Sequence, residues 1–413
     1  MTPGLPAARA SWVVVGSLWL VLGVAFGLFF SFPVFFVPLV EEFRWGRGVT
    51  AGAFSLSAIV QGLLSPLVGA MVDRVGPRRV MLVGGTVLAA SCLLAGRVSA
   101  VWQLYLVTGV LAAIGLCAVG WVPSGTLVAQ WFAHRRGSMM GLAFSGMGVG
   151  VLVIGPLAQW LITAYGWRHA YSILGAGALV VLVPVIWFGI VETPRRPAAD
   201  GESARAGTAP AGDGIGVSEA LATRSFWALF FAYLCTPLAV FPVVTHQVAF
   251  AVDLGFPRLF VAGIFGLTGL MSTGGRIVFG VAADRIGREL SATLSYACTA
   301  AGTLALLALE VSPRALWLYL YAVLFGLGFG ARGPIITAMA SQLFPGRRFG
   351  AIYGIMSVGN GVGGALGPWF AGFIHDVTRS YRVAFLIAAA FCAAGSACFW
   401  LARPRRDGKS LSR

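Results

Sequence analysis

The sequence predicts an all-α membrane protein with twelve transmembrane helices in two pseudo-symmetric six-helix bundles. Three observations predict this fold: a composition too apolar for a soluble domain, apolar stretches of membrane-spanning length along the whole chain, and a repeat that relates the two halves. Of the 413 residues, 58% are hydrophobic and only 10% are charged, and the mean hydropathy is +0.86. A water-soluble fold is nearly excluded.

The apolar stretches give the individual helices. A helix needs about 20 apolar residues to cross the hydrocarbon core, and the first stretch is too long for the core of a signal peptide. The segment 192–225 differs from the rest because it is rich in Pro, Gly, Ser, Ala and charge and has no apolar period. We therefore expect an N-terminal bundle over 1–191, a cytoplasmic linker over 192–225 and a C-terminal bundle over 226–413. The expected spans are 12–38, 49–72, 80–97, 101–128, 138–163, 169–191, 226–250, 260–283, 290–309, 315–341, 350–374 and 384–402.

The distribution of basic residues predicts the orientation. If the N-terminus is cytoplasmic, the segments on that side hold 19 of the 29 Lys and Arg residues, and those on the other side hold eight. By the positive-inside rule both termini then lie in the cytoplasm. We expect a multi-pass protein of the plasma membrane, present as a monomer.

The two halves repeat each other at an offset of about 211 residues. This offset superposes Gly69-Ala70-Met71-Val72-Asp73-Arg74-Val75-Gly76 on Gly280-Val281-Ala282-Ala283-Asp284-Arg285-Ile286-Gly287. At 212, Arg135 and Arg136 superpose on Arg347 and Arg348. Glycine permits a tight turn, and Asp73 or Asp284 can cap a helix or pair with an arginine of the opposing segment. These loops are predicted to form a breakable conformational latch, with a binding site near the membrane midplane where the halves meet. The predicted latch residues are Gly69, Asp73, Arg74, Gly76, Gly280, Asp284, Arg285, Gly287, Arg135, Arg136, Arg347 and Arg348.

The repeated Gly-x-x-x-Asp-Arg-x-Gly pattern resembles the signature loop of the major facilitator superfamily. Over nearly its whole length the chain looks like the monocarboxylate transporter family in its bacterial form. The stretches that carry this resemblance are Ser31-Phe32-Pro33-Val34-Phe35-Phe36-Val37-Pro38-Leu39, Glu41-Glu42-Phe43-Arg44-Trp45, Leu64-Ser65-Pro66-Leu67-Val68-Gly69, Trp131-Phe132-Ala133-His134-Arg135-Arg136-Gly137 and Arg348-Phe349-Gly350-Ala351-Ile352-Tyr353-Gly354. The resemblance implies the major facilitator fold and transport of a small organic anion such as lactate or pyruvate by alternating access, coupled to protons.

Two arginines stand out as substrate ligands. The expected spans contain no Asp, Glu or Lys, and Arg276 and Arg332 are the charged residues inside them. A charge at the centre of a spanning helix costs roughly 2.5–3.5 kcal/mol on insertion scales and is kept where it faces a cavity or a partner. A guanidinium pairs with a carboxylate through two parallel hydrogen bonds. The alternative for Arg276 is neutralisation by helix carbonyls or snorkelling to the surface, and the alternative for Arg332 is bonding to carbonyls freed by the neighbouring glycines and proline.

The resemblance implies that an arginine of the eighth helix, in Arg276-Ile277-Val278-Phe279-Gly280, binds the substrate carboxylate. The family's acidic residue one turn earlier is Ser272 here, and its lysine in the first helix aligns near Phe30. The proton-coupling candidates that remain are therefore His246, near the outer end of the seventh helix, and Asp253 just beyond it. Each has a structural alternative, as a hydrogen-bonded histidine and a solvated carboxylate.

Aromatic residues are expected to line the cavity with these arginines. Phe30, Trp121 and Tyr353 lie on cavity-lining helices of the superfamily and are assigned to substrate binding, although each could be packing or face lipid. If both arginines faced the cavity, the chain could be a dicarboxylate exchanger like the oxalate–formate exchangers. Those use a lysine in the eleventh helix, where this chain offers Asn360, so the monocarboxylate interpretation is favoured.

Several other classes are excluded or disfavoured. The one lysine is Lys409, so no phosphate-binding loop for ATP can form and transport is expected to be secondary. The four histidines are scattered, which argues against an enzyme, a metal site or another cofactor. The net charge of +15 is dispersed in short clusters between apolar stretches, which argues against nucleic acid. Efflux of drugs or metabolites stays open as an alternative, but it would favour an arginine in the middle of the fourth helix.

Overall fold

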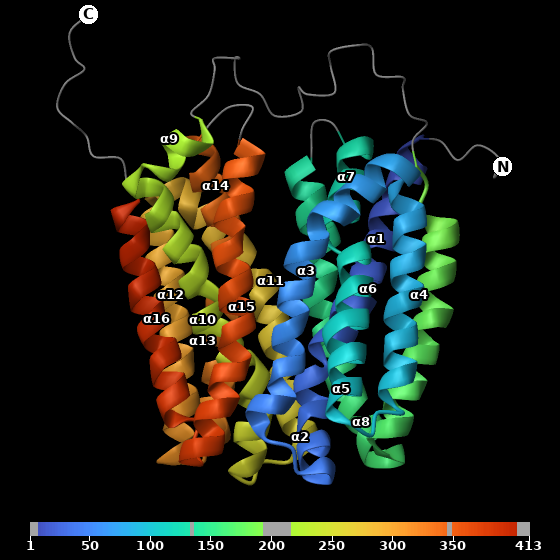
Figure 1. Ribbon diagram of the computed structural model, residues 1–413, viewed down its shortest axis with the longest axis vertical. Coiled ribbons are helices and arrows are strands. Elements are labelled where there is room, and N and C mark those ends of the chain that lie inside the picture. Colours follow the sequence, from blue (N-terminus) through green and yellow to red (C-terminus); the bar gives the residue numbers. More distant parts are fainter. Residues whose placement is uncertain (1–6, 133–135, 193–215, 345–348, 403–413) are drawn as a thin grey trace, which may run out of the picture.

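The computed structural model of the protein describes residues 7–132, 136–192, 216–344 and 349–402. The helices run nearly side by side along the long axis of the molecule (Figure 1). The elements of the first half, in order, are α1 (Ala7–Phe30), α2 (Phe32–Phe43), α3 (Arg47–Val75), α4 (Pro77–Ala95), α5 (Val101–Leu104), the π-helix η1 (Tyr105–Leu111), α6 (Ala112–Val119), α7 (Trp121–Trp131), α8 (Arg136–Pro184) and the π-helix η2 (Val185–Gly189).

The second half has the same order of long helices. Its elements are α9 (Val217–Leu221), α10 (Arg224–Asp253), α11 (Arg258–Ile286), α12 (Arg288–Leu307), the 3-10 helix η3 (Ala308–Glu310), α13 (Ala315–Phe329), α14 (Arg332–Leu343), α15 (Phe349–Thr378) and α16 (Arg382–Leu401). Within the described ranges, nine helical segments are long and apolar enough to cross a membrane. One of them, Met139–Gly189, holds two spans. The pair α13 and α14 forms one further span and α15 forms another, which brings the number of spans to twelve. The predicted fold is confirmed.

Several predicted spans are interrupted where the sequence suggested continuous helices. The first span breaks at Ser31 between α1 and α2, and the fourth breaks at Gly120, whose φ of −74° and ψ of −135° are not helical. The fifth and sixth spans run on as α8, but Gly166 has a φ of +78° and turns the chain between them. Only glycine takes up such a conformation at low cost.

The end of the predicted linker is helical. Residues 217–221 form α9, Ala220 is buried, and α10 begins at Arg224. The hydroxyl of Thr223 caps α10 by accepting a hydrogen bond of 3.2 Å from the Phe226 backbone N–H. The expectation of an irregular segment therefore fails here because the apolar residues of α9 pack onto the start of α10.

The two halves meet along three pairs of helices: α2 with α10, α3 with α15, and α8 with α11. In Figure 1 the blue α3 and the orange α15 face each other at the centre of the molecule. We call the end at which α2 finishes and α3 begins the α2 end, and the end at which α1 begins and α16 finishes the terminal end.

The apolar core shows that the halves are joined at the α2 end. One buried cluster includes Phe36 of the first half together with Val244 and Phe385 of the second half. The part of the second half toward the terminal end has a separate cluster, around Phe226 and Phe344. Burial of apolar area therefore holds the two halves together mainly at one end.

Glycines allow the closest helix contact of the first half, between α1 and α8. A Cβ at Gly150 would lie 1.8 Å from the Gly23 carbonyl oxygen, and a Cβ at Gly146 would lie 2.1 Å from that of Trp19. Backbones can approach this closely only where no side chain intervenes, which is how small residues stabilise helix pairs in membranes.

We predict that Gly150→Ala lowers the thermal midpoint of the purified protein by several degrees, since overpacking costs about 1–3 kcal/mol. The matched control is Gly177→Ala on the same helix, because a Cβ there meets nothing within 4 Å. That control should melt at the wild-type temperature or slightly above it. Equal midpoints for the two variants would contradict the packing argument.

Candidate functional site

Arg276 and Trp121 face each other across the boundary between the halves. The Cζ atom of Arg276 on α11 lies 5.9 Å from the ring centroid of Trp121 on α7. Trp121 is 51% exposed and Arg276 is half-buried, so both can be reached from outside the packed helices. A guanidinium at this distance from an indole is attracted by its π-electrons.

Aromatic rings extend the site on the side of the first half. Trp121 packs edge to face on Phe144 at 4.5 Å and on Phe26 at 6.1 Å between centroids. Phe30 stacks with Phe26 at 6.2 Å and lies 6.2 Å from Phe54. The first half therefore contributes an aromatic wall, and Phe30 and Trp121 are both part of it.

Arg276 has no anionic or carbonyl partner among the described residues. Its guanidinium makes no hydrogen bond and no ion pair there, and its contact is the ring of Trp121. The residue one turn earlier, Ser272, donates to the Gly269 carbonyl at 2.7 Å and does not reach the guanidinium. The five N–H donors of Arg276 are thus available to a ligand.

Arg332 lies inside the C-terminal bundle. It is fully buried, its Nη2 donates a hydrogen bond of 2.9 Å to the Thr299 hydroxyl, and its Cζ lies 4.3 Å from the ring centroid of Tyr296. Neighbouring helices cover the guanidinium in this conformation, and among the described residues it has no hydrogen bond to a helix carbonyl. Its assignment to substrate binding stays a prediction.

The two remaining binding candidates lie on α15. The hydroxyl of Tyr353 is hydrogen-bonded to the hydroxyls of Tyr233 at 3.0 Å and Thr337 at 2.7 Å. Tyr353 therefore ties three helices of the C-terminal bundle together. Asn360 is half-buried on the same helix, two turns further along.

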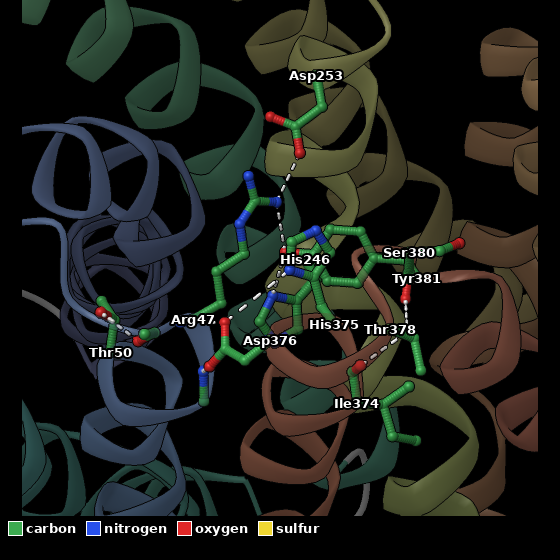
Figure 2. Close-up of polar contacts among 12 residues, drawn as sticks. Arg47, Thr50, His246, Asp253, Ile374, His375, Asp376, Thr378, Ser380 and Tyr381 are labelled. Carbon is green, nitrogen blue, oxygen red and sulfur yellow. Dashed lines mark hydrogen bonds and ion pairs between the residues drawn. The ribbon is translucent and has the colours of Figure 1, made fainter.

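The polar residues at the α2 end form a cluster that crosses between the halves (Figure 2). Nη1 of Arg47, at the start of α3, donates to Asp253 Oδ2 at 2.6 Å and to the Tyr381 hydroxyl at 2.8 Å. The backbone N–H groups of Arg47 and Gly48 donate to the two carboxylate oxygens of Asp376 at 2.8 Å each. We call Arg47, Asp253, Asp376, Tyr381 and His246 the clasp.

Asp376 caps a helix of the other half. α3 begins after Gly46, which has no side chain to satisfy the first N–H groups of the helix, and Asp376 of α15 supplies the missing acceptors. Its negative charge also suits the positive end of the helix dipole. Nearby, Arg258 Nη2 donates to Glu41 Oε1 at 2.6 Å, which adds a second ion pair between the halves.

His246 completes the clasp from inside. It is fully buried, its Nε2 lies 2.9 Å from the Pro368 carbonyl and its Nδ1 lies 3.1 Å from the Tyr381 hydroxyl. A carbonyl can only accept, so Nε2 carries a proton, and the hydroxyl of Tyr381 donates to Nδ1 of the neutral ring. Burial raises the pKa of the Tyr381 hydroxyl above its usual value, despite the nearby Arg47, so the hydroxyl keeps its proton.

The predicted latch loops are described in part. Gly76 and Gly287 end α3 and α11 with φ of +90° and +92°, so glycine is required at both turns. At the turn after α3, the carboxylate of Glu192 accepts a hydrogen bond of 2.7 Å from the Arg78 backbone N–H. Gly69, Arg74, Gly280 and Arg285 lie on the last turns of α3 and α11, and Asp73 and Asp284 are exposed there. Arg135, Arg347, Arg348 and the side chain of Arg136 lie outside the described residues, so the latch stays a prediction.

Sequence reasoning missed most of the clasp. In the sequence, Arg47 is one of the eight basic residues outside the predicted cytoplasmic segments, and nothing distinguishes Asp376 or Tyr381. One signal could have found them. The chain has only 14 acidic residues against 29 basic ones, so a carboxylate near a helix end, such as Asp253 or Asp376, is expected to pair with one of the many arginines.

The chain is similar to known transporters over nearly its whole length. The profile of the Major Facilitator Superfamily matches residues 18–332 and 315–413. Monocarboxylate transporter 13 of Rattus norvegicus is 29% identical over 391 residues, which cover 95% of this chain and 88% of the relative, and monocarboxylate transporter 11 of Homo sapiens is 29% identical, covering 96% and 84%. Among solved structures, a bacterial homolog of the human lysosomal transporter Spinster, inward-facing and unoccupied, aligns with a TM-score of 0.74 at 14% identity over 97% of both chains. The nucleoside transporter NupG aligns with a TM-score of 0.76 at 14% identity, over 95% of this chain and 100% of its own.

We predict that Asp376→Asn loosens the clasp, because the amide NH2 group would replace one of the two carboxylate oxygens and face an N–H group of α3 that now donates to it. Loss of a helix cap costs about 1 kcal/mol, which corresponds to about fivefold in the population of separated halves. The measurement is the electron–electron distance between spin labels at Tyr165 and Val311, two exposed positions of the α2 end, in a chain whose native cysteines are replaced.

The control is Glu310→Gln, which changes an exposed carboxylate of the same end. The Asn variant should populate longer distances, and the control should match the wild-type distribution. An unchanged distribution in Asp376→Asn would show that the cap does not hold this end together.

Proposed function

The chain belongs to the Major Facilitator Superfamily and is a membrane transporter, and from that premise we propose that it carries small monocarboxylates such as lactate or pyruvate across the plasma membrane. Arg276 carries the proposal. It is a permanent cation within a spanning helix, without a hydrogen-bond acceptor among the described residues, and it faces the aromatic wall of the other half. A ligand that combines one carboxylate with a small apolar body matches these two surfaces.

The transport step that we propose is alternating access around Arg276. The clasp and the continuous core close the α2 end, while the separate cluster around Phe226 and Phe344 leaves the halves less connected toward the terminal end. With both termini in the cytoplasm, this conformation opens Arg276 toward the cytoplasm. A substrate held by both Arg276 and the aromatic wall would favour the two halves moving as units around it.

Proton coupling, in this proposal, acts through Asp253. Its carboxylate is 43% exposed and is the ion-pair partner of Arg47. Protonation from the α2 side would neutralise Asp253 and leave Arg47 without that partner, which weakens the clasp and favours opening to the side that supplied the proton. His246 is less suited to carry the proton, since a second proton would place a cation beside Arg47.

The monocarboxylate assignment is favoured over its alternatives by the placement of Arg332. A dicarboxylate site would need a second cation beside Arg276 at the same surface, and the guanidinium of Arg332 is fully covered. Efflux of bulky apolar compounds would leave the charge of Arg276 unused. Transport needs no ATP in this proposal, since a proton gradient supplies the free energy.

We predict that Arg276→Gln lowers uptake of labelled lactate or pyruvate into proteoliposomes by about 10- to 100-fold, since hydrogen bonds to a charged group contribute about 1.5–3 kcal/mol. The control is Arg314→Gln, an exposed arginine of the same half, which should transport like the wild type. If Arg276→Gln remained folded and kept its full uptake, Arg276 would not be the carboxylate ligand.

We predict that Asp253→Asn abolishes the acceleration of uptake by an inward proton gradient. The amide resembles the protonated acid in charge, so the variant should transport at one rate with or without the gradient, while the wild type is faster with it. The control is again Glu310→Gln, which should respond to the gradient. A normal gradient response in Asp253→Asn would place the coupling proton elsewhere.

A further inference from the structure

Arg332 is a buried cation whose hydrogen bonds are incomplete. It opens α14 and is fully buried, and Thr299 accepts from its Nη2. Its Nε and Nη1 are buried and have no acceptor. An arginine guanidinium is not deprotonated in proteins, so its N–H donors cannot be removed by loss of a proton. Two donors therefore point into the protein interior without a partner.

The surroundings do not neutralise this charge. The ring of Tyr296 at 4.3 Å and one hydroxyl offer only partial compensation. The side chain of Cys392 also contacts the guanidinium. Among the residues that the structure describes, none of the ion pairs includes Arg332. An unpaired charge in a low-dielectric interior costs several kcal/mol. An anion bound beside the guanidinium would reduce this cost.

A second cation close by raises this cost. The side-chain stem of Arg276 passes α14 near its start, because a Cβ at Gly330 would lie 2.9 Å from the Arg276 Cγ. Two guanidinium groups on adjacent helices, with no carboxylate paired to either in the described part of the chain, create a positive potential in the C-terminal bundle.

We propose that Arg332 is the centre of a second anion site, inside the C-terminal bundle, that binds a small inorganic anion of halide size. The ligand accepts hydrogen bonds from Nε and Nη1 of Arg332 and neutralises the guanidinium. The site is distinct from the carboxylate site at Arg276, whose guanidinium lies against Trp121 and not among α12, α14 and α16. We propose a monatomic anion and not an organic acid because Tyr296 and Thr299 pack directly against the guanidinium.

The test measures the thermal midpoint of the purified full-length protein in sodium bromide and in the sodium salt of a bulky sulfonate at equal ionic strength. A ligand that binds the folded state raises the midpoint in a saturable way. Bromide should raise it in the wild type, in Arg276→Gln and in Arg314→Gln, and the apparent affinity should fall at least about tenfold in Arg332→Gln.

Two results would overturn the proposal. If the wild type showed no saturable response to bromide, the buried donors would not bind an anion. If the response disappeared in Arg276→Gln and remained in Arg332→Gln, the anion would occupy the carboxylate site instead. Should Arg332→Gln fail to fold, anomalous diffraction from wild-type crystals with bromide decides: a bromide beside Nε or Nη1 supports the site, and none there refutes it.

Discussion

The hydrocarbon core of a membrane cannot solvate a charge, and this constraint organises the whole molecule. Carboxylates and most arginines stay at the helix ends, and the spanning helices keep two arginines inside, Arg276 and Arg332. Each of the two lies near an aromatic ring, Trp121 for the first and Tyr296 for the second. A ring face attracts a cation without supplying a negative charge. Both guanidinium groups therefore remain able to attract an anion, which is the property that the proposed transport of a carboxylate requires.

The clasp suits the gate that the proposed transport cycle needs, because such a gate must both close and reopen. Its pairs are partly exposed, with the Asp253 side chain 43% exposed, and ion pairs of this kind contribute about 0.2–1 kcal/mol each. The cap that Asp376 places on α3 contributes about as much. In the proposed transport cycle, a few such interactions together favour the closed α2 end by an amount that binding of one substrate or one proton could reverse. A fully buried set of charges at the same place would cost far more to separate.

The sequence was sufficient for the fold because membrane helices follow from length and hydropathy, and the repeat followed from the two Gly-x-x-x-Asp-Arg-x-Gly loops. It was also sufficient to single out Arg276, since a charge inside an apolar span is conspicuous. It could not predict the clasp, because the contact of Arg47 with Asp253 and Tyr381 joins residues more than 200 positions apart. Nor could it predict that Arg332 is buried, since which face of a helix meets the partner half depends on packing.

Arg332 lies at a break in the fourth helix of its half, and the first half has the equivalent break. The fourth helix of the first half restarts at Trp121, and that of the second half restarts at Arg332, 211 positions later, which is the offset of the repeat. Trp121 points to the boundary between the halves and is 51% exposed, whereas Arg332 points into its own bundle and is fully buried. The duplication therefore preserved the scaffold, while equivalent positions in the two halves acquired different chemistry and different directions.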